Sequence, residues 1–292
     1  MRRTGMLPAL LGCFAILAAQ PATAEEEEQQ LDSEDVIVIE GDQPVSVRDV
    51  RRQAGSITPR EGAVGAPLAR MRREVCVGVY GLAPDSARLV IDRIYYNAEA
   101  VGLKVSEEEG CTANIVVAVV EDPREEFASL RRESSRLVEG IDLWERKRVA
   151  EQEGPALAWN AVATTAFDGS QPIGRGPPVF ESTMSGRTGT HTLREIMVSV
   201  VLVDSEALAG LDGVTLADYA TMRSLAHTRA PIEAISAPTV LGLFTAEGAP
   251  DRLSAFDRGY LRSLYGGPGN RPLSYAMSDI GREIRREMEG RE

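Results

Sequence analysis

The sequence predicts an α+β fold: a mixed β-sheet with an N-terminal β-α-β unit and a helical C-terminal part. Three patterns support this class. Residues 75–120 read as strand, helix and strand; residues 191–204 form a long Val- and Ile-rich run; and the last 80 residues show helical periodicity. The chain of 292 residues is 43% hydrophobic and 26% charged, which is typical of a globular protein.

The first 24 residues have the pattern of a secretory signal peptide. Arg2 and Arg3 provide a positive start, residues 7–19 are mostly apolar, and the small residues Ala-Thr-Ala end at Ala24. We therefore expect cleavage between Ala24 and Glu25. The mature protein is then periplasmic or secreted.

The same segment has a second interpretation as a lipoprotein signal. Residues 10–13 read LLGC, which resembles a bacterial lipobox and would make Cys13 a lipidated N-terminus. The apolar run before Cys13 is very short, and apolar residues continue after it, so cleavage after Ala24 is favoured. We expect no membrane span in the mature chain.

Residues 25–69 are interpreted as an acidic flexible arm followed by small elements. Residues 25–35 hold seven acidic residues and no basic one, a composition typical of disorder. After this arm we expect a strand over 36–39, a helix over 47–52 opened by a capping box of Ser46 and Asp49, and a Gly- and Pro-rich linker over 55–66. A single α+β domain over 70–292 would begin near Arg70.

The β-α-β unit is the best-defined part of the N-terminal half. Residues 75–80 form a strand, and Pro84 opens a helix at a position where its missing N–H costs little. Gly102 ends this helix and a short strand over 103–105 follows. Residues 114–120 are an unbroken apolar run, which is typical of a strand buried on both faces. The helix presents one apolar face, made of Ala87, Val90, Ile91, Ile94, Tyr95 and Ala98.

The rest of the chain alternates charged helices and strands before it becomes helical. We expect helices over 123–137 and 141–152, a strand over 156–167 that carries Trp159, a Gly-rich loop over 169–189 and a strand over 191–204. Thr215 with Asp218, and Ser254 with Asp257, fit capping boxes that open two further helices. A short apolar turn over 238–244 and a charged helix over 274–288 complete the predicted elements.

The cysteines predict a disulfide. Export places Cys76 and Cys111 in an oxidising compartment, and signal cleavage would remove the third cysteine, Cys13. The alternative is a reactive thiol at one of them. Because the chain has no C-x-x-C motif, the disulfide is favoured.

The sequence offers no established catalytic motif and no cofactor site. The net charge of −12 argues against nucleic acid as a partner. His191 and His227 are too far apart in sequence for a helical H-E-x-x-H zinc site, and no G-x-S-x-G or phosphate-binding glycine motif occurs. Asp218 and Asp257 fit helix caps better than catalytic carboxylates.

Two C-terminal stretches resemble matrixin-like zinc peptidases. Residues 253–266 read LSAFDRGYLRSLYG, similar to the final helix of that family. Residues 218–226 follow the strand 197–204 as the family's metal helix follows its edge strand. This resemblance implies a zincin-like shape without the metal motif, whose two histidines and acidic residue would fall at Tyr219, Arg223 and Ala220.

Most of residues 36–285 also resembles a group of uncharacterised exported proteins from alphaproteobacteria, through the paired cysteines, the helix 217–226 and residues 240–244. Together these resemblances imply an exported, non-catalytic domain that binds a peptide or protein partner, since a zincin-like cleft can keep its groove without its metal. The alternative function is a hydrolase with a carboxylate-based site.

Overall fold

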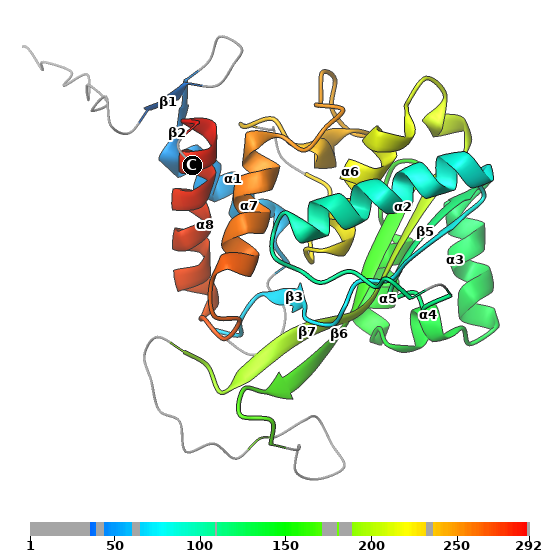
Figure 1. The fold of residues 1–292 in the computed structure, drawn as a ribbon, viewed down its shortest axis with the longest axis horizontal. Coiled ribbons are helices and arrows are strands. Elements are labelled where there is room, and N and C mark those ends of the chain that lie inside the picture. Colours follow the sequence, from blue (N-terminus) through cyan, green and yellow to red (C-terminus); the bar gives the residue numbers. More distant parts are fainter. Residues whose placement is uncertain are drawn as a thin grey trace, which may run out of the picture. The chain divides into compact units, whose positions relative to one another are not determined.

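The computed structural model describes residues 36–38, 44–59, 65–108, 110–170, 180, 189–231 and 236–290, which belong to one compact unit. These residues form an α+β fold, as the sequence predicts (Figure 1). The expected cleavage site at Ala24 and Glu25, Cys13, the acidic run 25–35 and most of the loop 169–189 lie outside the described residues. No helix within the described ranges is long and apolar enough to cross a membrane.

A five-stranded sheet is organised around its longest strand, β7 (Thr192–Asp204). The strand β6 (Ala156–Ala166) runs antiparallel along one side of β7. The other side pairs in parallel with β3 (Ala69–Met71) near its start and with β5 (Ile115–Val120) near its end. The strand β4 (Val77–Tyr80) lies beyond β5, again in parallel. The sheet is thus mixed and mainly parallel.

The β-α-β unit is confirmed, and its helix, α2 (Pro84–Glu99), connects β4 to β5. The predicted apolar face supplies Val90 and Ile94, both fully buried. Gly102 follows the helix with a φ of +82°, a conformation that favours glycine. The disulfide Cys76–Cys111 is present and ties the start of β4 to the segment before β5.

Both faces of the sheet are covered. On one face, α2 and α6 (Gly213–Ser224) pack over a core that includes Ile115 and Val117 of β5. On the other face, Val116 contacts a smaller apolar cluster that is covered by the helices α3 (Pro123–Arg132) and α4 (Arg136–Glu139). Trp159 of β6 anchors that cluster: its indole N–H donates to the Leu137 carbonyl at 2.7 Å.

The predicted domain boundary near Arg70 needs correction. The first helix, α1 (Val47–Ile57), extends into the start of the predicted linker and buries Val50, Ala54 and Ile57 in the main core. Before α1, the strands β1 (Val36–Val38) and β2 (Pro44–Ser46) pair as an antiparallel hairpin. The folded unit therefore includes elements that the sequence interpretation assigned to the arm.

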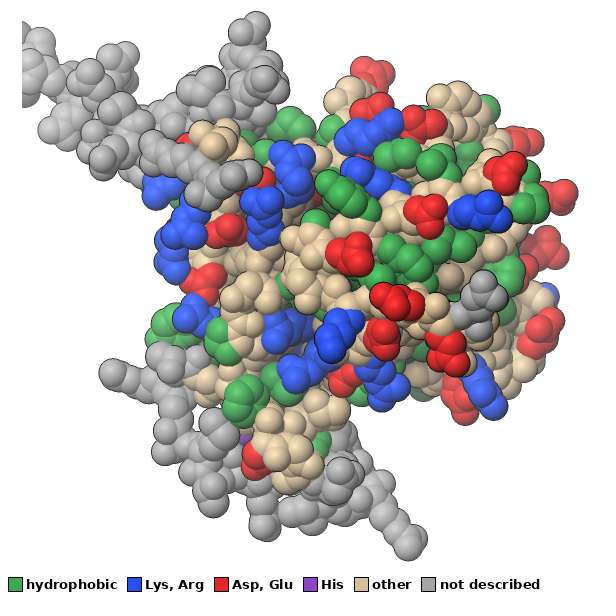
Figure 2. Space-filling model, in the orientation of Figure 1, with side chains coloured by type: hydrophobic (Ala, Val, Ile, Leu, Met, Phe, Trp, Pro, Cys, Tyr) green, Lys and Arg blue, Asp and Glu red, His purple; other side chains and the backbone are tan. Residues whose placement is uncertain are grey.

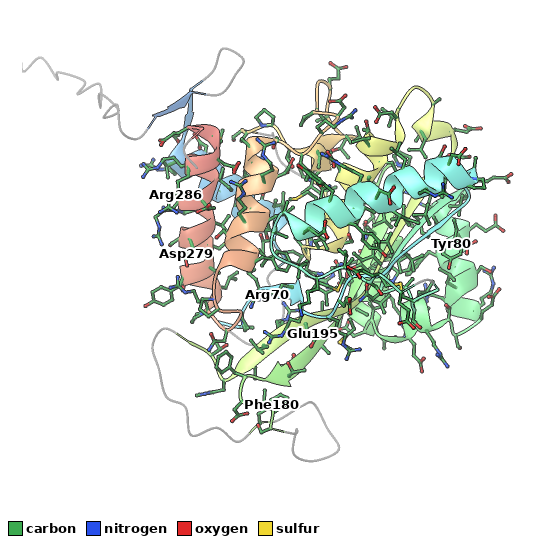
Figure 3. The ribbon with its side chains drawn as sticks, in the orientation of Figure 1. Arg70, Tyr80, Phe180, Glu195, Asp279 and Arg286 are labelled. Carbon is green, nitrogen blue, oxygen red and sulfur yellow. A yellow bond between two sulfur atoms is a disulfide. The ribbon has the colours of Figure 1, made fainter. Side chains whose placement is uncertain are left out.

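Two C-terminal helices, α7 (Ala255–Gly266) and α8 (Leu273–Met288), pack closely side by side (Figure 1). Arg70 of β3, labelled in Figure 3, donates to the carbonyls of Leu264 and Gly267 at 3.1 and 2.8 Å and so satisfies the end of α7. Burial lowers the pKa of this guanidinium. On the face shown in Figure 2, acidic and basic side chains are interspersed, with basic groups over α8.

One predicted helix start is wrong. Thr215 and Asp218 do not open α6; its N-cap is Asp212, whose carboxylate accepts from the Thr215 N–H at 2.8 Å. The other two capping residues are confirmed, because Ser46 caps α1 and Ser254 forms a capping box with Asp257. Three further short elements are α5 (Leu143–Ala150) and the 3₁₀ turns η2 (Glu206–Leu208) and η3 (Val240–Gly242).

Candidate functional site

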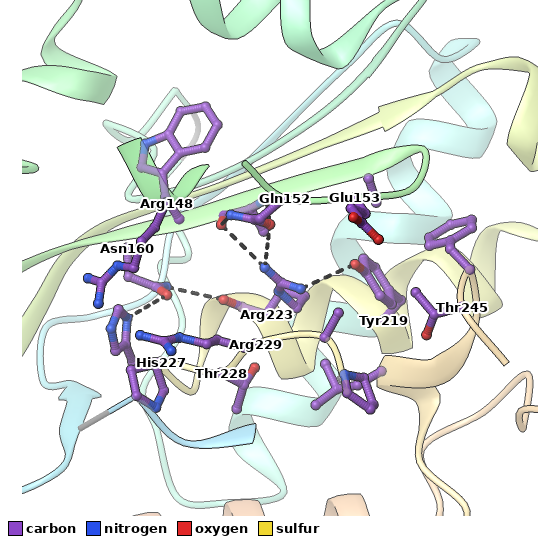
Figure 4. A pocket seen from close by; sticks show the side chains of 18 of the residues that line it. Arg148, Gln152, Glu153, Asn160, Tyr219, Arg223, His227, Thr228, Arg229 and Thr245 are labelled. Carbon is purple, nitrogen blue, oxygen red and sulfur yellow. Dashed lines mark hydrogen bonds between the residues drawn. The ribbon is translucent and has the colours of Figure 1, made fainter. Parts of the chain in front are cut away.

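A cleft of ≈490 Å³ lies between the strand β6 and the helix α6 (Figure 4). The chain between α5 and β6 borders one side of it, and the segment after α6 together with the region of η3 borders another. The side chains that matter most for its chemistry are Gln152, Asn160, Tyr219, Arg223, His227 and Phe244.

The helix α6 places two polar side chains in the cleft wall. Tyr219 and Arg223 are four residues apart, so they share one face of the helix. Their side chains are 2% and 3% exposed, and the Arg223 Nη1 lies 3.5 Å from the Tyr219 hydroxyl. The Tyr219 ring also meets the Phe244 ring edge-to-face at 5.0 Å, which fixes its orientation.

Arg223 is a buried cation whose partners are all neutral. Its Nη2 donates to the side-chain oxygen of Gln152 at 3.0 Å and to the Ala158 carbonyl at 3.2 Å. Its Nε is buried and makes no hydrogen bond to a described group. No carboxylate in the described part of the chain pairs with this guanidinium, which is unusual because buried charges are generally compensated.

The Gln152 side chain occupies the outer edge of β6. Its Nε2 donates to the Ala158 carbonyl at 2.8 Å, and its Oε1 accepts from the Ala158 N–H at 3.1 Å. One side-chain amide thus makes the two bonds that a residue of a neighbouring strand would make.

Asn160 connects β6 to the end of α6. Its amide nitrogen donates to the Ser199 hydroxyl at 2.8 Å and to the Arg223 carbonyl at 3.1 Å. Ser199 in turn donates to the Ser224 carbonyl at 2.9 Å. Because both amide donors are committed, the Asn160 oxygen accepts, and the His227 Nδ1, 3.0 Å away, carries the proton. The network satisfies the last carbonyls of α6 and holds the helix against the strand.

The carboxylates of the cleft lie on the α5 side. Glu145 forms an ion pair with Arg148, and Glu151 lies 3.7 Å from Lys147. Glu153 is the third acidic residue of the lining. Two of these three carboxylates therefore already have a basic partner on α5.

Asp218 and Asp257 do not line the cleft. Asp218, interpreted from sequence as a cap, instead receives two hydrogen bonds from Arg93 of α2 and is fully buried. Asp257 caps α7 as expected, and it also accepts from the Thr239 hydroxyl at 2.5 Å and from the Val240 N–H. Burial raises the pKa of the Asp257 carboxyl.

The predicted degenerate metal-helix positions divide between cleft and core. Tyr219 and Arg223 line the cleft, whereas Ala220 is fully buried in the main core. His227 joins the lining, but His191, just before β7, does not. Among the residues that the structure describes, no three His, Cys, Asp or Glu side chains gather as a possible metal site.

The strand expected at the edge of the cleft, residues 197–204, does not lie there. Residues 197–204 belong to β7, which is paired on both sides, and the strand that borders the cleft is β6. Sequence reasoning missed Gln152, Ala158 and Asn160 as cleft residues. For Asn160 a signal existed, since it is a polar residue inside a strand that is otherwise largely apolar.

Comparison of the chain with models of protein families, with curated proteins and with solved structures finds no match. The geometry of the cleft is therefore the basis for a functional proposal.

Proposed function

We propose that this protein is an exported, non-catalytic domain that binds an extended peptide segment of a protein partner in the cleft between β6 and α6. The observation that carries the proposal is the outer edge of β6, which borders the cleft and whose Ala158 N–H and C=O point away from β7. Extended peptides bind such edges by adding a strand.

The register of β6 defines where a peptide would pair. The Pro155 carbonyl accepts from the Asp204 N–H of β7 at 2.9 Å, so it faces inward, whereas both Ala158 groups face outward. Backbone direction alternates along a strand, so the outward positions before the bulge at Ala161 and Val162 are Ala156, Ala158 and Asn160. A peptide would meet three backbone positions there.

A degenerate zincin-like fold is part of this proposal. A helix below a bordering antiparallel strand, with Tyr219, Ala220 and Arg223 at the positions of the metal motif, supports it. The disulfide supports export to the periplasm or the outside of the cell, where such bonds persist.

The test is a binding titration of the purified protein with pooled, fluorescently labelled short peptides. We expect saturable binding that is lost in Ala158→Pro, because proline removes the outward N–H while leaving the bonds to β7 in place. Circular dichroism and an intact disulfide would establish that the variant is folded. If that variant fails to fold, amide chemical shifts of the wild-type protein replace it, and peptide-induced shifts confined to residues far from β6 would contradict the proposal.

The alternative is a hydrolase that uses carboxylates of the cleft. Its direct test is turnover of a panel of peptides and glycans, together with the zinc content of chelator-washed protein. One equivalent of zinc, or turnover that is lost in Glu153→Gln, would contradict a non-catalytic role. Folded protein without turnover would agree with it.

A further inference from the structure

The uncompensated charge of Arg223 indicates the chemistry of the ligand. Arg223 is 3% exposed as a residue and its Nε is buried, so its guanidinium has lost most of its hydration. Its acceptors here are a hydroxyl, an amide oxygen and a carbonyl. Burying a cation is costly unless a counter-ion compensates it. A carboxylate that enters the adjacent cleft would supply this counter-ion, and arginine matches carboxylate geometry well.

Gln152 shows which atoms fit beside Arg223. Its side-chain oxygen lies where two donors converge, the Ala158 N–H at 3.1 Å and the Arg223 Nη2 at 3.0 Å. Its side-chain nitrogen donates to the Ala158 carbonyl at 2.8 Å. The site thus has room for one small group that carries both a hydrogen-bond acceptor oxygen and an N–H donor.

We propose that the cleft recognises the free C-terminal residue of a peptide, an inference that rests on the proposed function. In an antiparallel pair, one residue exchanges both backbone bonds with the residue opposite. A terminal residue opposite Ala158 donates its N–H to the Ala158 carbonyl, and one of its carboxylate oxygens accepts from the Ala158 N–H. The second carboxylate oxygen then accepts from Arg223, and Gln152 is displaced.

The same register defines the side chain of the terminal residue. Directly opposite residues of an antiparallel pair project to the same face of a sheet. The Ala158 side chain belongs to the core on the α6 side, together with Tyr219 and Leu241, and Phe244 packs against this core. All four residues also line the cleft. The preferred terminal residue is therefore apolar.

The cleft lining carries charges of both signs. Arg229 lies near Arg223 (Figure 4). Of the acidic lining residues, Glu145 is paired with Arg148, Glu151 lies 3.7 Å from Lys147, and Glu153 is the third. Ala158 lies near the N-terminal end of β6, and the chain before this end leads within a few residues back to Gln152. The peptide chain would therefore extend in the other direction, toward Asn160. A peptide that runs antiparallel to β6 and terminates opposite Ala158 needs no space at the Gln152 end.

The experiment compares three matched peptide pools. The first two pools end in Leu, Val or Phe, one with a free C-terminal acid and the other amidated. The third pool is amidated and has Glu as its last residue. We expect the acid pool to bind at least about tenfold more tightly than both others, which corresponds to one charge-assisted hydrogen bond. Equal binding of acid and amide would overturn the carboxylate inference but leave the peptide-binding function standing. Equal binding of the third pool would assign the carboxylate to a side chain and also overturn it. Absence of binding in all pools would overturn both proposals.

Two variants locate the effect at the proposed site. Arg223→Met should abolish the preference for the acid over the amide, whereas Arg262→Met, which removes an arginine of α7 outside the cleft, should preserve it. Gln152→Ala removes the internal competitor and should tighten binding of the acid pool several-fold, so it tests the inference even if Arg223→Met does not fold. Unchanged or weaker binding by folded Gln152→Ala would contradict the displacement of Gln152.

Discussion

Arg93 of α2 and Asp218 of α6 form a bidentate ion pair in which the arginine side chain is partly exposed. The Nε and Nη2 atoms of Arg93 lie 2.7 and 2.9 Å from the two carboxylate oxygens of Asp218, whose side chain is fully buried. Asn97 and the Leu253 N–H donate to the same carboxylate at 2.8 and 3.0 Å. The hydrogen bond that Arg93 itself donates to Asp218 raises the pKa of Arg93. The pair fixes α6, and with it the cleft wall, against α2.

Replacing Arg93 with methionine should destabilise the protein strongly. The variant leaves the Asp218 carboxylate buried without a cation, which costs about 3 kcal/mol when one partner of a buried pair is removed. Urea titration measures this loss, and Arg88→Met on the exposed side of the same helix is the matched control, with a change within about 0.5 kcal/mol. Adding Asp218→Asn to Arg93→Met should cost less than the sum of the two single changes, and simple additivity would contradict the coupling.

Gly259 should be the glycine of α7 that is least tolerant of a side chain. A Cβ atom there would lie 2.5 Å from the Ile284 Cα of α8, so the two helices would have to separate. We expect Gly259→Ala to destabilise by about 1–3 kcal/mol. Gly266→Ala in the same helix meets nothing within 4 Å and should be neutral or stabilising. Thermal melts of both variants check this, and equal melting temperatures would refute the close-packing argument.

Loss of the Cys76–Cys111 bond should lower the melting temperature. The bond closes a loop with a sequence separation of 35, and the chain-entropy model assigns such a loop about 3–4 kcal/mol. For a domain of this size we expect a decrease of roughly 10 °C on reduction. In the double variant Cys76→Ser/Cys111→Ser the reductant should have no further effect. A reduced wild-type protein that melts like the oxidised one would contradict a stabilising role.

Asp212 should make the protein sensitive to acid. The hydrogen bond from the Thr215 N–H is the largest cause, and the one from Arg252 the next, of a decrease in the pKa of this carboxyl from 3.8 to about 2. Because the folded-state pKa lies below the unfolded one, the ionised group stabilises the fold above about pH 4, and this contribution disappears as the pH falls toward 2.

The variant Asp212→Asn keeps a capping oxygen but does not titrate, so its stability should fall less steeply between pH 4 and 2. Urea midpoints across this range measure the slope. Asp251→Asn, which removes a neighbouring exposed carboxylate that caps no helix, is the matched control. A slope that matches the wild-type protein in Asp212→Asn would refute the assignment.

The elements that were predicted correctly rest on local signals. Pro84 and Gly102 mark the start and the end of α2, and Ser254 with Asp257 marks the start of α7. The Thr215 interpretation failed because a competing N-cap, Asp212, lies three residues earlier and uses the Thr215 hydroxyl as a donor. Local spacing alone does not decide between two overlapping capping patterns.

The cleft could not be predicted from the sequence, because it is formed by contacts between residues that are far apart in the chain. Tyr219 and Arg223 could be paired from sequence because they are four residues apart on one helix. Gln152 meets Arg223 across 71 residues and Asn160 meets His227 across 67, through the pairing of β6 with β7. Which strand borders the cleft follows from the order of strands in the sheet, and the prediction for residues 197–204 was wrong for that reason.

The most direct test of peptide binding at β6 is hydrogen exchange of single backbone amides, measured by NMR with and without a bound free-acid peptide. The account predicts that the outward Asn160 amide exchanges more slowly in the complex, because a peptide strand then pairs along the outer edge of β6. Amides of α8, on the far side of α7, should exchange unchanged. Slower exchange in α8 without any change in β6 would contradict the account.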